Sequence, residues 1–174
     1  MSRINPILSL DPSSTVVGYA AMTARGRLME AGLIAPECKR DASYARICAM
    51  RLDLRGLLDR LKPTIILIEW TKGKVGRRRH AGRGAGLAVY GAGVGAIATE
   101  CEIWAERCTP SPQVVPILEN DWTRGVRKED RTLAIKQLYP QYRHADDPGG
   151  DVADALGLAR WYLRQDSIDG GYLE

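Results

Sequence analysis

The chain has 174 residues and a formal net charge of +4, with 45% hydrophobic and 26% charged residues. These values are those of an ordinary globular protein and exclude a disordered or fibrous chain. The length predicts one domain over residues 1–174. No apolar run approaches the ~18 residues of a membrane-spanning helix, and residues 1–5 lack the apolar core of a signal peptide. We therefore expect a cytoplasmic protein that does not contact membranes.

The cysteines form no CxxC pair, and no histidine stands at zinc-ligand spacing from them (Cys38, Cys48, Cys101 and Cys108). Free cysteine tends to be buried. The sequence therefore predicts buried, reduced thiols, as is usual in a reducing cytoplasm.

Three short strands open the chain. Apolar residues predict a buried strand over residues 6–11, a second strand over 15–22 and a third over 28–34, with turns at residues 12–14 and at Gly26. Strands so closely spaced form an antiparallel meander.

A helix and a central strand follow. Apolar residues recur at helical spacing between residues 42 and 61, and Pro63 ends that helix. Residues 64–70 are predicted to form a strand, and its run 65–68 is apolar on both faces, which is typical of a central parallel strand. A helical crossover between parallel strands places Asp11 and Glu69 at the same carboxyl edge of the sheet, where open α/β sheets bind ligands.

The second half of the chain is mostly helical. We predict a long helix rich in small residues over 84–108, a fifth strand over 114–118, a loop over 120–125, and helices over 128–139 and 151–165. The expected fold class is α/β, with a five-stranded mixed sheet (a three-stranded antiparallel meander plus two parallel strands) flanked by helices. The glycines of residues 91–95 lack the spacing of a nucleotide-binding loop, so we expect no nucleotide cofactor and interpret them as packing positions.

Two further acids, Asp151 and Asp154, lie three residues apart on one face of the last predicted helix. Aspartate is also favoured at helix starts as a cap, and Asp147 is an equally good candidate for that cap. Both interpretations of the pair stay open. If the pair meets Asp11 and Glu69, the repulsion among the carboxylates requires raised pKa values or bound divalent cations.

Carboxylate oxygens are the ligands that Mg²⁺ prefers in proteins. Two such ions ~3.5–4 Å apart can activate water and stabilise the leaving oxygen of a phosphodiester. We therefore predict that Asp11, Glu69, Asp151 and Asp154 bind two Mg²⁺ ions, with Mn²⁺ as an alternative metal, in a nuclease.

Basic residues follow Glu69 directly, six of them within twelve residues that contain no acid (Lys72, Lys74, Arg77, Arg78, Arg79 and Arg83). A charge run is usually a solvated loop, but its place beside the acids favours contact with DNA phosphates. Trp70 is either a core residue or a stacking platform for an unpaired base. Lys128 and Arg131 share a helix face and either contact the scissile phosphate or decorate the surface.

Four motifs in this order are similar to those of RuvC-type Holliday junction resolvases. Residues 7–19 (ILSLDPSSTVVGY) resemble the opening hairpin of that family, although Ser13 stands where the family usually has glycine. Residues 66–70 (ILIEW) resemble its second acidic strand, and residues 90–97 (YGAGVGAI) its small-residue helix. Residues 151–156 (DVADAL) resemble its closing Asp-x-x-Asp-Ala-Leu motif.

The resemblance implies a ribonuclease H-like fold, the four acids as metal ligands, and a homodimer that nicks four-way DNA junctions symmetrically during recombination or repair. The function expected is that of a Mg²⁺-dependent, structure-selective endonuclease acting on branched DNA. One alternative is a non-catalytic module that binds branched DNA. Another is an actin-like ATPase domain, whose first hairpin has a similar acidic pattern but which needs two such domains around a nucleotide.

Overall fold

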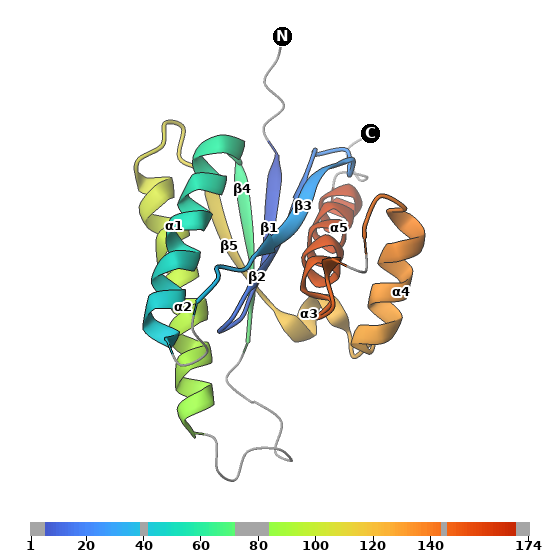
Figure 1. Ribbon diagram of the computed structural model, residues 1–174. Helices are drawn as coiled ribbons and strands as arrows, with labels where there is room; N and C mark the ends of the chain where they lie inside the picture. The colour runs from blue at the N-terminus through green and yellow to red at the C-terminus, as the bar shows by residue number, and fades with distance from the viewer. Residues whose placement is uncertain (1–5, 39–41, 72–83, 144–145, 170–174) are drawn as a thin grey trace.

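The computed structural model describes residues 6–38, 42–71, 84–143 and 146–169, and for residues 84–87 and 166–169 it describes the backbone alone. A mixed sheet lies at the centre, with helices on both of its faces (Figure 1). Its strands are β1 (Ile7–Pro12), β2 (Val17–Met22), β3 (Leu28–Ile34), β4 (Ile65–Trp70) and β5 (Gln113–Leu118).

The strand order in the sheet is β3-β2-β1-β4-β5. The first three strands pair antiparallel, whereas β4 pairs parallel with both β1 and β5. The sequence predicted this mixed five-stranded sheet, and the prediction is confirmed.

Two helices, α1 (Ser43–Leu61) and α2 (Gly84–Glu106), cover one face of the sheet. On the other face lies α5 (Asp151–Asp169), and α4 (Lys128–Leu138) packs on its outer side (Figure 1). No helix in the described ranges is both long and apolar enough to cross a membrane.

One element differs from the prediction. Residues 120–125 were expected to form a loop, but Glu119–Thr123 form the short helix α3. Two acids in its first turn favour a helix there because they complement the helix dipole. Arg124 ends the helix in the left-handed conformation, with its N–H donating to the carbonyl of Asn120 at 3.3 Å.

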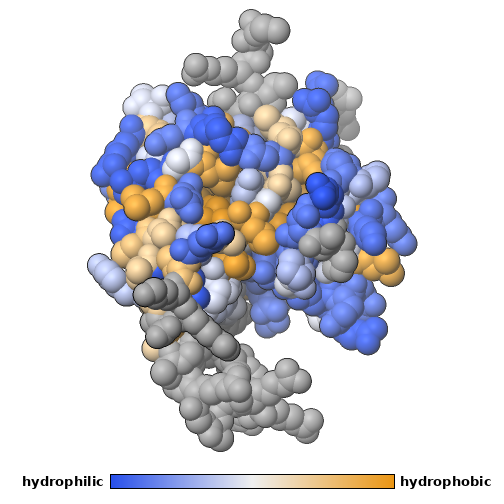
Figure 2. Space-filling model, viewed as in Figure 1, coloured by the Kyte–Doolittle hydropathy of each residue, from blue (hydrophilic) through white to orange (hydrophobic). Residues whose placement is uncertain are grey.

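The alternation of side chains along β1 divides the core between the two faces. Leu8 and Leu10 pack toward Met50 and Leu54 of α1, while Ile7 packs on the opposite face with Leu158 of α5. In the view of Figure 2, hydrophobic residues gather over the middle of the molecule and α4 is mostly hydrophilic.

The prediction of four buried thiols is wrong in part. Cys101 is fully buried in the core between α2 and the sheet, but Cys38, Cys48 and Cys108 are only half-buried. All four are free thiols, as expected.

Candidate active site

Asp11 and Glu69 lie side by side at the carboxyl edge of the sheet. The parallel register pairs Leu10 with Ile68, so each acid is the next residue on its strand. Two residues before Asp11, Ser9 donates a hydrogen bond to the carbonyl of Ala155 in α5 at 2.6 Å. Because strand side chains alternate with a period of two, both acids point toward the face that α5 covers.

The start of α5 is pressed against the same edge. Gly18 of β2 lies opposite Asp11 in the antiparallel register. A Cβ at position 18 would lie 2.2 Å from the carbonyl oxygen of Asp151, so a residue larger than glycine does not fit there without movement. This close approach brings the Asp151–Asp154 face of α5 to the ends of β1 and β4.

Asp147 settles the question of the helix cap. Its carboxylate accepts hydrogen bonds from the backbone N–H groups of Asp151 at 2.9 Å and Ala153 at 3.1 Å, and from the hydroxyl of Tyr142 at 2.7 Å. The two backbone bonds satisfy two of the free amides in the first turn of α5. The side chains of Asp151 and Asp154 are therefore not needed as caps.

The acids repel one another. Burial, followed by the charges of Glu69 and Asp154, raises the pKa of Asp11 well above its ordinary value. Burial and the charges of Asp154 and Glu119 likewise raise the pKa of Glu69 to about 7. Since the charges of Glu69, Asp151 and Asp154 all raise the pKa of Asp11, the fold brings the predicted carboxylates of β1, β4 and α5 within electrostatic reach.

Two cations from α4 lie against the acids of α5. Lys128 Nζ is 3.0 Å from both Asp151 Oδ1 and Asp154 Oδ2, and Arg131 Nη2 is 2.9 Å from Asp154 Oδ1. Burial alone would lower the pKa of Lys128, but the neighbouring carboxylates raise it above its ordinary value. Both side chains therefore form ion pairs with the acids of α5 and are not simply solvated surface charges.

Sequence reasoning missed two residues of this region. Trp122 of α3 donates its indole N–H to Glu69 Oε2 at 2.8 Å, and the guanidinium carbon of Arg131 lies 4.9 Å from the centre of its ring. Tyr90 of α2 has its pKa raised, first by burial and further by the charges of Asp11 and Glu69. An isolated tryptophan in a polar segment directly after a strand was a signal for a buried anchor.

Trp70 and the basic segment that follows it were predicted to contact DNA. Trp70 is 38% exposed at the end of β4, which argues against a core role and leaves its ring available for stacking. The six predicted cations of the basic segment lie outside the described residues (Lys72, Lys74, Arg77, Arg78, Arg79 and Arg83).

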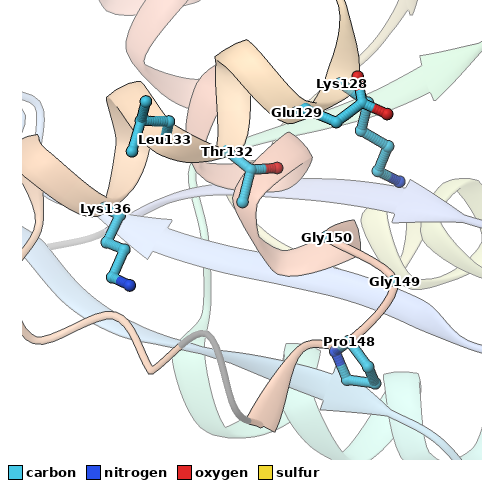
Figure 3. A pocket seen from close by; sticks show the side chains of 8 residues that line it. All are labelled: Lys128, Glu129, Thr132, Leu133, Lys136, Pro148, Gly149 and Gly150. Atoms are coloured by element: carbon cyan, nitrogen blue, oxygen red, sulfur yellow. The ribbon is translucent and has the colours of Figure 1, made fainter.

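A surface pocket of about 390 Å³ lies between α4 and the residues that precede α5 (Figure 3). Lys128, Thr132 and Lys136 of α4 line one side of it, and Gly149 and Gly150 the other. The pocket therefore borders the acids of α5 through Lys128.

The donor set fits a hard divalent cation, because it consists of carboxylate oxygens whose mutual repulsion a cation would relieve. Within the described part of the chain, no three carboxylate, imidazole or thiolate groups are already arranged to hold a metal ion. Asp151 and Asp154 are instead engaged by the cations of α4. A metal at these acids would therefore displace Lys128 from Asp151 Oδ1 and Asp154 Oδ2, whereas Arg131 bonds only to Asp154 Oδ1 and can stay.

The sequence matches no family model and no curated protein. The fold, however, is similar to solved structures. One is RuvC of T. thermophilus in complex with a Holliday junction substrate, with a TM-score of 0.66 and 14% identity over 92% of this chain and 96% of that chain. A second structure of Thermus thermophilus RuvC gives 0.64 and 15% over the same shares.

The yeast mitochondrial Holliday junction resolvase Ydc2 is also similar, with a TM-score of 0.65 and 13% identity over 97% of this chain and 82% of that chain. All three comparisons cover most of both chains, so the likeness is not confined to one motif. The chain therefore has the fold of the RuvC-type resolvases, as the motifs at both of its ends implied.

Proposed function

We propose that this protein is a Holliday junction resolvase, a Mg²⁺-dependent endonuclease that cleaves four-way and other branched DNA. The observation that carries the proposal is the meeting of acids from β1, β4 and α5 at one edge of a RuvC-like sheet, with the pKa values of Asp11 and Glu69 raised by burial and neighbouring charge. Buried acids with shifted pKa values are concentrated at functional sites in proteins.

Asp11, Glu69, Asp151 and Asp154 would hold the metal. Bound Mg²⁺ ions, or Mn²⁺ in their place, would activate a water molecule and stabilise charge on the phosphodiester. Asp11 is the central ligand in this proposal, because the charges of acids from both β4 and α5 raise its pKa.

The other residues would hold the DNA. Lys128 and Arg131 lie beside the acids, so a phosphate that approaches the metal would meet these two cations as well. Trp70, exposed at the end of β4, would stack on a base at the opened branch point. The basic segment that follows would bind phosphates further along the arms.

Resolution of a four-way junction requires two symmetric cuts, so we propose a homodimer. The surface of α2 is the candidate interface. A Cβ at Gly91 or Gly95 would meet nothing within 4 Å, whereas Gly93 already packs against Ser13 of its own chain. A dimeric mass in solution at working concentration is expected, and a monomeric mass would contradict this part of the proposal.

The test is a cleavage assay on a synthetic four-way junction, run beside a flap, a fork and a plain duplex, with Mg²⁺ or with EDTA. We expect paired, symmetric nicks in the four-way junction only with the metal, and little or no cleavage of the duplex. Equal cleavage of every substrate would contradict structure selectivity.

One observation favours a second candidate, a non-catalytic module that binds branched DNA. The salt bridges from Lys128 and Arg131 already neutralise part of the acidic cluster without a metal. The same assay separates the two functions, because such a module would retard the junction on a gel and leave it intact with Mg²⁺.

A further inference from the structure

Trp122 contacts two parts of the candidate site at once. The N–H of its indole donates to Glu69 of β4 at 2.8 Å. Its ring lies against the guanidinium of Arg131, with 4.9 Å between the guanidinium carbon and the ring centre. Arg131 in turn donates from Nε and Nη2 to Asp154 Oδ1 at 3.0 and 2.9 Å. Trp122 and Arg131 together thus connect Glu69 of β4 to Asp154 of α5.

The topology explains why Trp122 reaches this place. In the parallel register of β4 and β5, Glu69 pairs with Ile117 and Trp70 with Leu118. Helix α3 begins at the next residue, so it lies at the same edge of the sheet as Glu69. Trp122 is only 7% exposed and belongs to the cluster of apolar residues between the sheet and α5.

Arg131 is also held from a second side. Its Nη1 donates to the carbonyl of Val126 at 2.7 Å, and its side chain is only 14% exposed. A guanidinium with three directed bonds and an aromatic face has little freedom to rotate. The orientation of Asp154 is therefore coupled to the position of the indole ring.

We propose that Trp122 is a positioning residue for the acidic cluster, which fixes Glu69 directly and Asp154 through Arg131 in the arrangement that binds the divalent cations. The inference rests on the proposed function. Hydrogen-bond partners behind metal ligands orient those ligands, and their loss typically lowers metal affinity about 10–100-fold.

The test is Trp122→Phe, which keeps an aromatic ring and removes the N–H. Mg²⁺ binding is measured by calorimetry on the full chain, and junction cleavage is measured as a function of Mg²⁺ concentration. We expect Mg²⁺ affinity to fall by about 10-fold or more, with the cleavage curve shifted to higher Mg²⁺ and the rate at saturating Mg²⁺ partly recovered.

The matched control is Trp104→Phe. Trp104 is 8% exposed, and its indole donates to a carboxylate of Asp59 at 2.8 Å, but it lies in α2 on the other face of the sheet. This variant also loses a buried N–H bond to an acid, yet we expect its Mg²⁺ affinity to stay within about twofold of wild type. Equal losses in the two variants would show that reduced stability explains both and would overturn the inference.

A second variant covers the case in which Trp122→Phe does not fold. A Cβ at Gly157 of α5 would lie 2.9 Å from Cζ3 of Trp122, so Gly157→Ala has to displace the ring while the N–H is kept. We expect Mg²⁺ affinity to fall in this variant too, and unchanged affinity would count against the inference.

The two hypotheses fail in different ways. If the wild-type protein cuts the junction and binds Mg²⁺ but Trp122→Phe and Gly157→Ala behave like it, the positioning role is wrong and the proposed function stands. If the wild-type protein neither binds Mg²⁺ nor cuts, the proposed function and the inference both fail.

Discussion

The two faces of the sheet each bury carboxylate charge, and they treat it in opposite ways. On the α1–α2 face, Glu100 is 1% exposed and accepts hydrogen bonds from Arg55 Nε at 2.6 Å and Arg51 Nη2 at 2.7 Å. Burial alone would raise its pKa, but the two arginines hold the pKa below its ordinary value. On the α5 face, burial and neighbouring carboxylates instead raise the pKa values of Asp11 and Glu69.

The difference lies in the balance of charge. Among the residues that the structure describes, two arginines pair with the single acid Glu100, whereas the four acids of the candidate site share two cations, Lys128 and Arg131. A buried acid with enough partners is compatible with a purely structural role. A cluster of acids with too few cationic partners lowers the stability of the folded state. Proteins typically keep such a destabilising cluster where a function requires it.

The largest effect expected is on cleavage. Changing each acid to its amide, Asp11→Asn and Glu100→Gln, makes a matched pair on the two faces. We expect Asp11→Asn to reduce the junction cleavage rate at least about 100-fold, as the loss of a preorganised electrostatic group does, while junction binding is kept. Glu100→Gln should cleave the junction at a rate within a few-fold of wild type. A wild-type cleavage rate for Asp11→Asn would contradict the role of Asp11 as a metal ligand.

The second effect tests the packing that creates the cluster. Gly18→Ala puts a Cβ against the backbone carbonyl of Asp151, so α5 has to move away from β2. Overpacking of this kind typically costs about 1–3 kcal/mol, and both the Tm and the cleavage rate should fall. The control is Gly56→Ala in α1, where a Cβ meets nothing within 4 Å and the greater helix propensity of alanine should raise the Tm slightly.

The same matched pair should separate in thermal stability when EDTA removes divalent ions. Asp11→Asn relieves repulsion in the cluster, so we expect the Tm to rise by roughly 2–4 °C. Glu100→Gln removes the negative charge that lies between Arg51 and Arg55, so we expect the Tm to fall by roughly 2–6 °C. Shifts of the same sign in the two variants, measured by thermal unfolding, would contradict the contrast between the faces.

The sequence predicted one half of this contrast and not the other. Asp11 and Glu69 were found because each follows an apolar run at the end of a strand, and parallel pairing then brings them together. Glu100 was not found, because nothing local to α2 shows that two arginines of α1 will cover it. Charge balance across packed elements is a tertiary property.

The same limit applies within the candidate site. The i,i+3 spacing of Lys128 and Arg131 placed them on one face of a helix, but it does not show that this face meets Asp151 and Asp154. Trp122 was assigned to a loop, since the polar residues around it outweighed the acids that favour a helix start. The roles of Arg131 and Trp122 depend on partners far away in the sequence, Asp154 for the arginine and Glu69 for the tryptophan.

The smallest effect expected is a change in pH dependence at Glu100. Its pKa in the folded protein lies below the ordinary value of 4.5, so it is ionised and stabilising at higher pH. As the pH falls through the folded pKa, the carboxylate takes up a proton, the bonds to the arginines weaken, and the stabilisation is lost. Stability that rises with pH over the acid range is therefore partly due to this group.

Glu100→Gln should flatten the dependence of unfolding free energy on pH below about 5, where the folded and unfolded forms of Glu100 bind protons unequally. The measurement is urea unfolding at several pH values between about 3 and 6. The control is Glu102→Gln, an exposed acid two residues along α2, which should leave the curve as in wild type. If both variants keep the wild-type slope, Glu100 owes its buried position to packing alone, and the arginines do not stabilise its charge.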